Sequence, residues 1–145
     1  MAKYSKIDGA KLSDHGTWPP ANWIAHRVRE LRKARGWSAQ KLADRIAEHG
    51  YEGLDRNVIA NLENGRRLTV SVEEWLVLSL ALDVAPIHLL VPFTDDRVLV
   101  GHWDIEADAA RDWIRGASPH PAQDERTFRT EVPEQEWQDF AGRED

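Results

Sequence analysis

Hydrophobic residues in the middle of the chain recur at helical spacing. Ile24, Val28 and Leu31 fall at positions i, i+4 and i+7, which form one face of a helix. Asn22 offers a side-chain cap for the start of this helix, and Gly36 is a residue type that often follows a helix end. We therefore expect a first helix that begins directly after Asn22 and stops before Gly36.

Two further short helices are predicted after the first. Ser38 and Asp55 each stand where a side-chain oxygen can cap the start of a helix. The second helix ends at Gly50 and the third at Gly65. The residues expected to face the core are Ala39, Leu42, Ala43 and Ile46 in the second helix and Ile59 and Leu62 in the third.

The clearest start signal is the sequence Ser-Val-Glu-Glu from Ser71 to Glu74. It is a capping box, in which the two end residues each bind the other's backbone N–H. Residues 75–82 are apolar on nearly every face, which predicts a central, buried helix. Pro86 then opens a fifth short helix, because proline is tolerated in a first turn, and Pro92 closes the unit.

The pattern predicts an all-α domain over residues 22–92, because no strand signal interrupts its five helices. The polar residues 1–21, which include Gly9, Gly16 and the pair Pro19-Pro20, are expected to form a flexible N-terminal arm. Residues 93–145 form a C-terminal extension that is expected to be mostly helical or irregular. Within it we predict a short extended piece at 97–100, a helix at 104–115, irregular structure at 117–131 and a last helical turn at 133–140.

Composition narrows the class of protein. The 145 residues allow one domain and an appendage. The chain has no cysteine, which excludes a disulfide framework, a thiol nucleophile and a thiolate zinc site. No apolar run approaches the roughly 20 residues that a membrane span needs, and the first residues do not resemble a signal peptide. We therefore expect a cytoplasmic protein with no membrane partner.

The net charge of −6 argues at first against a nucleic-acid partner. Its distribution changes that conclusion. Residues 24–67 hold 10 basic and 6 acidic side chains, whereas residues 93–145 hold 6 basic and 14 acidic ones. A DNA surface responds to charges within about a Debye length, ~8–10 Å, so the local balance decides. The pattern fits either a solvating acidic tail or a basic front with an acidic rear.

The sequence contains no pattern typical of an enzyme. Its histidines are scattered, with no H-E-x-x-H spacing, and it has neither a phosphate-binding G-x-x-x-x-G-K-[ST] loop nor a G-x-S-x-G nucleophile turn. We therefore expect no catalytic residues, no metal site and no cofactor.

Three stretches, in order, carry a resemblance: Leu31–Ala43 (LRKARGWSAQKLA), Ile59–Arg67 (IANLENGRR) and Ala81–Val84 (ALDV). Together they resemble the Cro/lambda-repressor-type, or XRE, helix-turn-helix family, over residues 23–91. The resemblance implies a five-helix domain that binds double-stranded DNA, and a transcriptional regulator that we expect to be a repressor and a homodimer. It also implies a structural ion pair between Arg32 and Glu63.

In such a fold a short helix enters the major groove, here residues 55–64, while neighbouring groups hold phosphates. The outward positions of that helix, Arg56, Asn57, Ala60 and Asn61, are the expected base-reading residues, because Arg suits guanine and Asn suits adenine. The alternative is that these four residues form an ordinary solvent-exposed helix face with no role in DNA binding. The expected phosphate contacts are Ser38, Gln40, Lys41, Arg45, Asn64, Arg66 and Arg67.

Two departures from the family pattern affect this assignment. The second position of the second helix, where the family commonly has a DNA-contacting Gln, is Ala39, and Gln40 follows it. The connection at residues 49–54 is longer than the usual tight turn, so it could tilt the reading helix or touch the DNA backbone itself.

The extension carries Trp103, Trp113, Trp137 and Phe140 in a segment too thin to bury them alone, which indicates docking or an interface. We expect docking on the main domain together with self-association, with the helix at 104–115 as the dimer candidate. The alternatives are an acidic tail that competes with DNA, and an antitoxin-like interaction module whose extension at 93–145 binds a protein partner.

Overall fold

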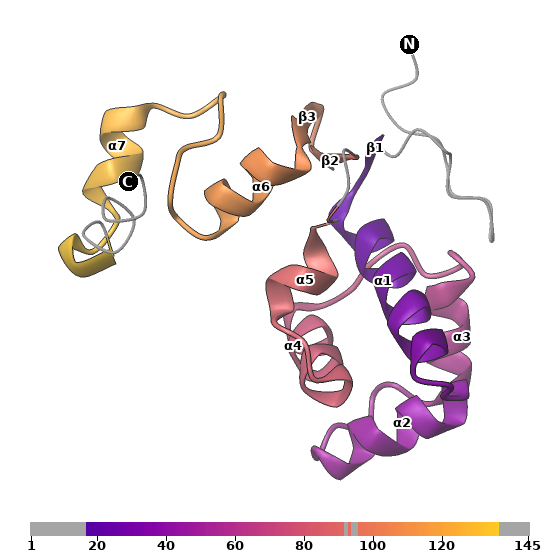
Figure 1. The fold of residues 1–145 in the computed structure, drawn as a ribbon. Helices are drawn as coiled ribbons and strands as arrows, with labels where there is room; N and C mark the ends of the chain where they lie inside the picture. The colour runs from indigo at the N-terminus through magenta and orange to yellow at the C-terminus, as the bar shows by residue number, and fades with distance from the viewer. Residues whose placement is uncertain (1–16, 92, 94–95, 137–145) are drawn as a thin grey trace.

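The computed structural model describes residues 17–91, 93 and 96–136. Five helices form the main domain in the predicted order (Figure 1). They are α1 (Pro20–Ala34), α2 (Ala39–Glu48), α3 (Arg56–Glu63), α4 (Val72–Leu82) and α5 (Pro86–Leu90). The extension adds strands β2 (Arg97–Val100) and β3 (Trp103–Glu106) and helices α6 (Ala107–Ile114) and α7 (Glu125–Thr130), and strand β1 (Thr17–Trp18) precedes α1.

The caps of three helices are as predicted. Ser38 accepts a hydrogen bond from the backbone N–H of Lys41 at the start of α2, and Asp55 accepts one from Val58 at the start of α3. Both halves of the Ser71 capping box are present at α4. The cap predicted at Asn22 is wrong. The helix α1 begins three residues earlier, after Pro19, because a first-turn proline has its φ preset and lacks only an N–H that would be unbonded there.

The main core lies between the five helices and contains the predicted inward residues. The first helix contributes Ile24 and Val28, with Leu31 partly buried at its edge. Leu54, in the long connection between α2 and α3, is also buried in this core. The other fully buried side chains with the largest volumes are Leu42, Ile46, Ile59, Leu62, Leu78, Leu82 and Leu89.

The helix α4 is not buried on all sides, which corrects the prediction of a central helix. Leu78 and Leu82 are fully buried against α1, α2 and α5. Val72, Leu76 and Leu80 are exposed, with 44% of Leu76 and 57% of Leu80 accessible to solvent. No element among the described residues covers this face, because its neighbours all pack on the other side of the helix.

The extension folds back onto the main domain through a second core. The strand β2 lies between β1, to which it is parallel, and β3, to which it is antiparallel. Beneath this sheet the rings of Trp18 and Trp23 lie 4.2 Å apart, and the indole N–H of Trp23 donates to the carbonyl of Arg97 at 3.2 Å. The other buried members of this core are Val91, Val98, Ile105, Ala107 and Ala110.

This second core corrects several expectations. The part of the predicted arm that the structure describes is strand and helix, because Trp18 is buried; residues 1–16 lie outside the described residues. The extended piece at 97–100 is confirmed as β2. The predicted helix at 104–115 begins only at Ala107, because Trp103–Glu106 pairs with β2 as a strand.

The far end of the extension contains a helix that the sequence did not predict. The stretch at 117–131 was expected to be irregular, but Asp124 caps α7 by accepting from both the backbone and the hydroxyl of Thr127. Residues 134–136 are helical, and the remainder of the predicted last turn, with Trp137 and Phe140, lies outside the described residues.

A ring and two guanidinium groups also connect the extension to the main domain. Arg27 of α1 and Arg111 of α6 lie 5.9 Å and 5.3 Å from the ring centre of Phe93.

Among the helices that the structure describes, none is long and apolar enough to cross a membrane.

Candidate nucleic-acid interface

The helix α3 divides into a buried face and an outward face. Ile59 and Leu62 are fully buried in the main core. Arg56, Asn57 and Asn61 are exposed on the other side, and none of these three side chains has a hydrogen-bond partner among the residues that the structure describes. The partly buried Ala60 lies between them. The four residues predicted to read bases therefore lie together on the outward side of the helix.

Arg66 lies next to this outward face. It follows Gly65, whose φ of 73° is the left-handed conformation that glycine adopts easily. The backbone N–H groups of Arg66 and Arg67 both donate to the carbonyl of Asn61 at 3.0 and 3.1 Å. Asn61 and Arg66 border one hollow of about 550 Å³, together with Gly53, Val58 and Arg67. The exposed guanidinium of Arg66 has no hydrogen-bond or ion-pair partner among the described residues and lies beside this outward face.

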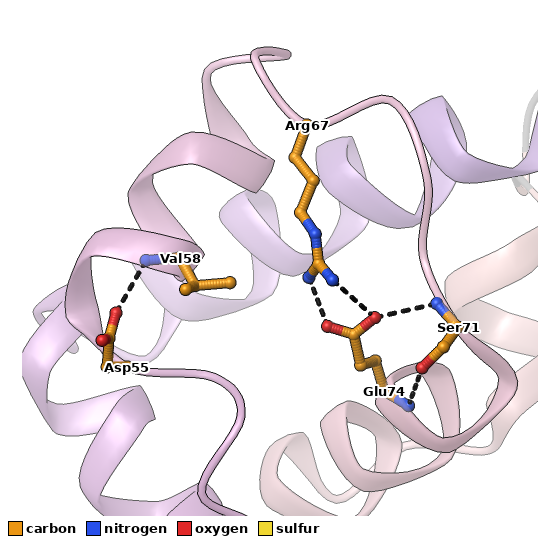
Figure 2. A network of polar contacts seen from close by, with 5 residues as sticks. All are labelled: Asp55, Val58, Arg67, Ser71 and Glu74. Atoms are coloured by element: carbon orange, nitrogen blue, oxygen red, sulfur yellow. Dashed lines mark hydrogen bonds and ion pairs between the residues drawn. The ribbon is translucent and has the colours of Figure 1, made fainter.

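Arg67 was also expected to contact phosphate, but its side chain is bound within the fold. Both terminal guanidinium nitrogens donate to the carboxylate of Glu74, one of them to Oε1 at 2.9 Å (Figure 2). Glu74 is 3% exposed, and its Oε1 also accepts from the backbone N–H of Ser71 at 2.9 Å. Burial on its own raises the pKa of Glu74, but the hydrogen bonds from Arg67 and Ser71 outweigh it and lower that pKa below its usual value.

Arg45 is directed toward α4 in a similar way. Its Nε donates to the carbonyl of Ala81 at 3.1 Å, its Nη2 lies 3.5 Å from the carboxylate of Asp83, and its guanidinium lies 4.8 Å from the centre of the Trp37 ring. These contacts hold the side chain of Arg45 at the C-terminal end of α4. The neighbouring Lys41 is exposed near the start of α2.

At the start of α2, the side chains of Ser38 and Gln40, both expected to contact phosphate, have partners within the helix. The hydroxyl of Ser38 is used as the helix cap, and Gln40 donates from Nε2 to the carboxylate of Asp44 at 2.8 Å. The cap takes up the backbone N–H of Lys41, and the earlier N–H groups of the first turn have no acceptor within the helix, as at any helix N-terminus.

The ion pair implied by the resemblance is present between Arg32 of α1 and Glu63 of α3. The Nε and Nη2 atoms of Arg32 lie 2.9 and 2.7 Å from the two carboxylate oxygens, and Nη1 donates to the carbonyl of Trp37 at 2.7 Å. The side chains are only 15% and 5% exposed. The hydrogen bond to Glu63 raises the pKa of Arg32, against the opposing effect of burial. The pair fixes the end of α3 against α1.

The long connection between α2 and α3 is held by residues that the sequence reading did not single out. Leu54 anchors it in the core, and the ring of Tyr51 folds over Gly53 so closely that a Cβ at Gly53 would lie 2.8 Å from Cε1 of the ring. In the sequence, the signal that could have identified Leu54 as a core residue is that it is the lone aliphatic residue in a polar connection. The connection borders a hollow of about 540 Å³ beside the first turn of α3.

Comparison with known proteins agrees with this geometry. The helix-turn-helix family model matches residues 28–89. The competence pilus inhibition repressor of Acinetobacter baylyi is 31% identical over 91 residues, which are 62% of this chain and 69% of that protein. The chain belongs to the XRE-type helix-turn-helix family. It is a DNA-binding transcriptional regulator, as this family is.

Two solved structures resemble part of this helix-turn-helix protein. The restriction-modification controller protein C.AhdI from Aeromonas hydrophila is 38% identical, covers 48% of this chain and 94% of its own, and superposes with a TM-score of 0.40. The hypothetical transcription factor NHTF from Neisseria is 27% identical, covers 61% and 92%, and has a TM-score of 0.46.

Proposed function

We propose that this helix-turn-helix regulator is a sequence-specific repressor that reads the DNA major groove with α3. The observation that carries the proposal is the outward face of α3. Arg56, Asn57 and Asn61 are exposed there and none of them is used by the fold. The name of the Acinetobacter baylyi relative, a repressor, supports repression as the sign of regulation.

The chemistry of the outward face suits base edges. A guanidinium forms two hydrogen bonds with O6 and N7 of guanine, and an Asn amide forms two with N6 and N7 of adenine. Each such pair discriminates against a wrong base by ~1–3 kcal/mol. Arg56 and Asn57 stand in the first turn of α3, the part of a reading helix that lies deepest in the groove.

The phosphate contacts in the proposal come from both sides of α3. Arg66 and Asn64 follow the helix, and Lys41 with the first-turn N–H groups of α2 precedes it. Arg45 and Arg67 contribute mainly to the fold, because Asp83 and Glu74 engage them. The acidic extension packs on α1 and α5, which is consistent with a basic front and an acidic rear.

The test is selection of bound sequences from random DNA duplexes. The proposal predicts a short recurring motif, and binding to that motif should weaken steeply as salt rises, because each phosphate contact releases counterions. Bound pools that stay random would contradict sequence-specific reading. We further propose that the protein binds as a two-fold dimer, for which the motif should be an inverted repeat with half-sites ~34–36 Å apart.

A second candidate function is an interaction module whose extension binds another protein. The observation that favours it is exposed apolar surface on the extension, where Trp103 is 48% accessible and Ile114 is also exposed. A small protein that co-purifies with the full chain and is lost in a Trp103→Ser variant would support this candidate.

A further inference from the structure

Two hollows on the surface beside α3 differ in charge. The first, of about 540 Å³, is bordered by α2 and the first turn of α3, and we call it the acidic hollow. Three carboxylates, from Asp44, Glu52 and Asp55, line it together with one cation, Arg56. The second, of about 550 Å³, is the basic hollow. Its lining residues are Gly53, Val58, Asn61, Arg66 and Arg67, none of them acidic. The charge of a DNA phosphate is therefore favoured in the basic hollow and opposed in the acidic one.

The basic hollow is bordered by hydrogen-bond donors that the fold does not use. The guanidinium of Arg66 and the amide of Asn61 are exposed, and neither has a partner among the residues that the structure describes. The backbone N–H of Gly53 likewise has no acceptor within the described part of the chain. Arg67 lines the hollow as well, but the buried Glu74 balances its charge. A free guanidinium and a free backbone N–H beside one hollow are the donors that phosphate oxygens accept from.

Gly53 stands at a position that leaves no room for a side chain. A Cβ there would lie 2.8 Å from Cε1 of Tyr51 and 3.0 Å from its hydroxyl oxygen, closer than atoms in van der Waals contact. The ring of Tyr51 lines the acidic hollow, whereas Gly53 lines the basic one. Leu54, the next residue, is buried in the main core and anchors the connection there. A side chain at position 53 therefore displaces either the ring or the backbone N–H that borders the basic hollow.

We propose that the basic hollow binds one phosphate of the DNA backbone, with the guanidinium of Arg66 and the backbone N–H of Gly53 as donors. The DNA is the duplex that α3 is proposed to read, so this inference rests on the proposed function. It makes the long connection between α2 and α3 a part of the DNA interface. Because Asn61 borders the same hollow, a phosphate held there also fixes the position of α3 relative to the bases.

The first experiment replaces single phosphates of the selected duplex by uncharged methylphosphonate and measures the affinity of the full chain for each duplex. At one position the replacement should weaken wild-type binding about tenfold. It should have little effect there on Arg66→Ala, which has already lost the contact, and a reduced effect on Gly53→Ala. The control Lys41→Ala should keep the full effect at that position. A full effect in Arg66→Ala or in Gly53→Ala at every position would overturn the inference.

The second experiment uses the collision between position 53 and Tyr51. Gly53→Ala should weaken binding to selected and random duplexes alike, by about three- to tenfold, because a phosphate contact carries no sequence information. The double variant Gly53→Ala/Tyr51→Ala removes the ring that the new Cβ meets and should regain most of that loss. Glu52→Ala, in the same connection but on the acidic hollow, should not weaken binding. A loss in Gly53→Ala that is confined to the selected motif, or that the double variant keeps in full, would contradict the inference.

A third measurement needs no variant and so does not depend on the folding of one. Glu52-Gly53 is the only Glu-Gly dipeptide in the sequence, so labelling Glu with carbonyl ¹³C and Gly with ¹⁵N identifies the amide signal of Gly53 by NMR. This signal should shift when the selected duplex is added, and should shift less with the methylphosphonate duplex identified above. The amides of Gly101 and Gly116, in the extension, serve as controls and should not move. An unchanged Gly53 signal in the saturated complex would refute the inference.

The two proposals fail separately. If wild type selects no motif, but random duplexes shift the Gly53 amide and bind Gly53→Ala more weakly, sequence-specific reading is refuted and the phosphate contact stands. If wild type selects a motif, but the Gly53 amide does not respond and no phosphate position depends on Arg66, the phosphate contact is refuted and sequence-specific reading stands.

Discussion

Arg67, just beyond the end of α3, donates both of its terminal guanidinium nitrogens to the buried carboxylate of Glu74 in the first turn of α4 (Figure 2). The same carboxylate closes the capping box with Ser71. One buried side chain thus joins Arg67 to Ser71 across the connection between α3 and α4. This arrangement ties the guanidinium of Arg67 to α4, whereas the adjacent Arg66 is exposed beside the outward face of α3.

The Glu74 network predicts a pH-dependent contribution to stability. Glu74→Gln should lower the free energy of unfolding at pH 7 by about 1–3 kcal/mol, because Arg67 loses its charged acceptor. The pKa of Glu74 is lowered in the folded protein, so its stabilising effect is fully present above its usual value of about 4.5. The effect is lost as the pH falls through the lower, folded-state pKa.

The measurement is denaturant unfolding of wild type and Glu74→Gln at a series of pH values. The difference between the two should stay constant from about pH 7 to 5.5 and shrink below about pH 4.5. The exposed Glu48 provides a control, since Glu48→Gln should show little difference at any pH. A Glu74→Gln difference that grows as the pH falls would contradict this account.

The pair between Arg32 and Glu63 predicts a larger loss. Glu63→Ala leaves the largely buried guanidinium of Arg32 without its partner, which should cost about 3–5 kcal/mol. Thermal unfolding followed by circular dichroism measures the effect, and Glu48→Ala should shift the midpoint very little. An unchanged midpoint in Glu63→Ala would show that the pair does not hold α3 against α1.

The second core predicts that the extension and the main domain unfold together. Leu90 packs against both cores, so the loss of one should destabilise the other. Val98→Ala, a cavity-forming change at a fully buried position of β2, should lower stability by about 1–3 kcal/mol within a single transition. Unfolding of the variant in two separate steps would mean that the extension is an independent unit.

The main domain was predictable because its signals are local. The caps at Ser38, Asp55 and Ser71 and the periodicity of residues such as Leu42 and Ile59 are written in neighbouring positions. The resemblance added the Arg32–Glu63 pair, which no local pattern could reveal because 31 residues separate the two side chains.

The features that the sequence did not reveal depend on distant contacts. The strand at Trp18 forms because β2, about 80 residues later, pairs with it and buries its ring. The roles of Arg45 and Arg67 depend on acceptors at α4, so exposure of these cations could not be judged from the pattern of charges. The outer face of α4 was assigned to the core because apolar composition alone does not distinguish a buried face from an exposed one.

The most direct test of the central claim compares Arg56→Ala with Arg66→Ala on the duplex motif selected by wild type and on random duplexes. If α3 reads bases, Arg56→Ala should lose ~1–3 kcal/mol of preference for the motif and change binding to random DNA little. Arg66→Ala should weaken both duplexes alike and reduce the salt slope by about one. Equal loss on both duplexes in both variants would contradict the assignment of α3 as the reading helix.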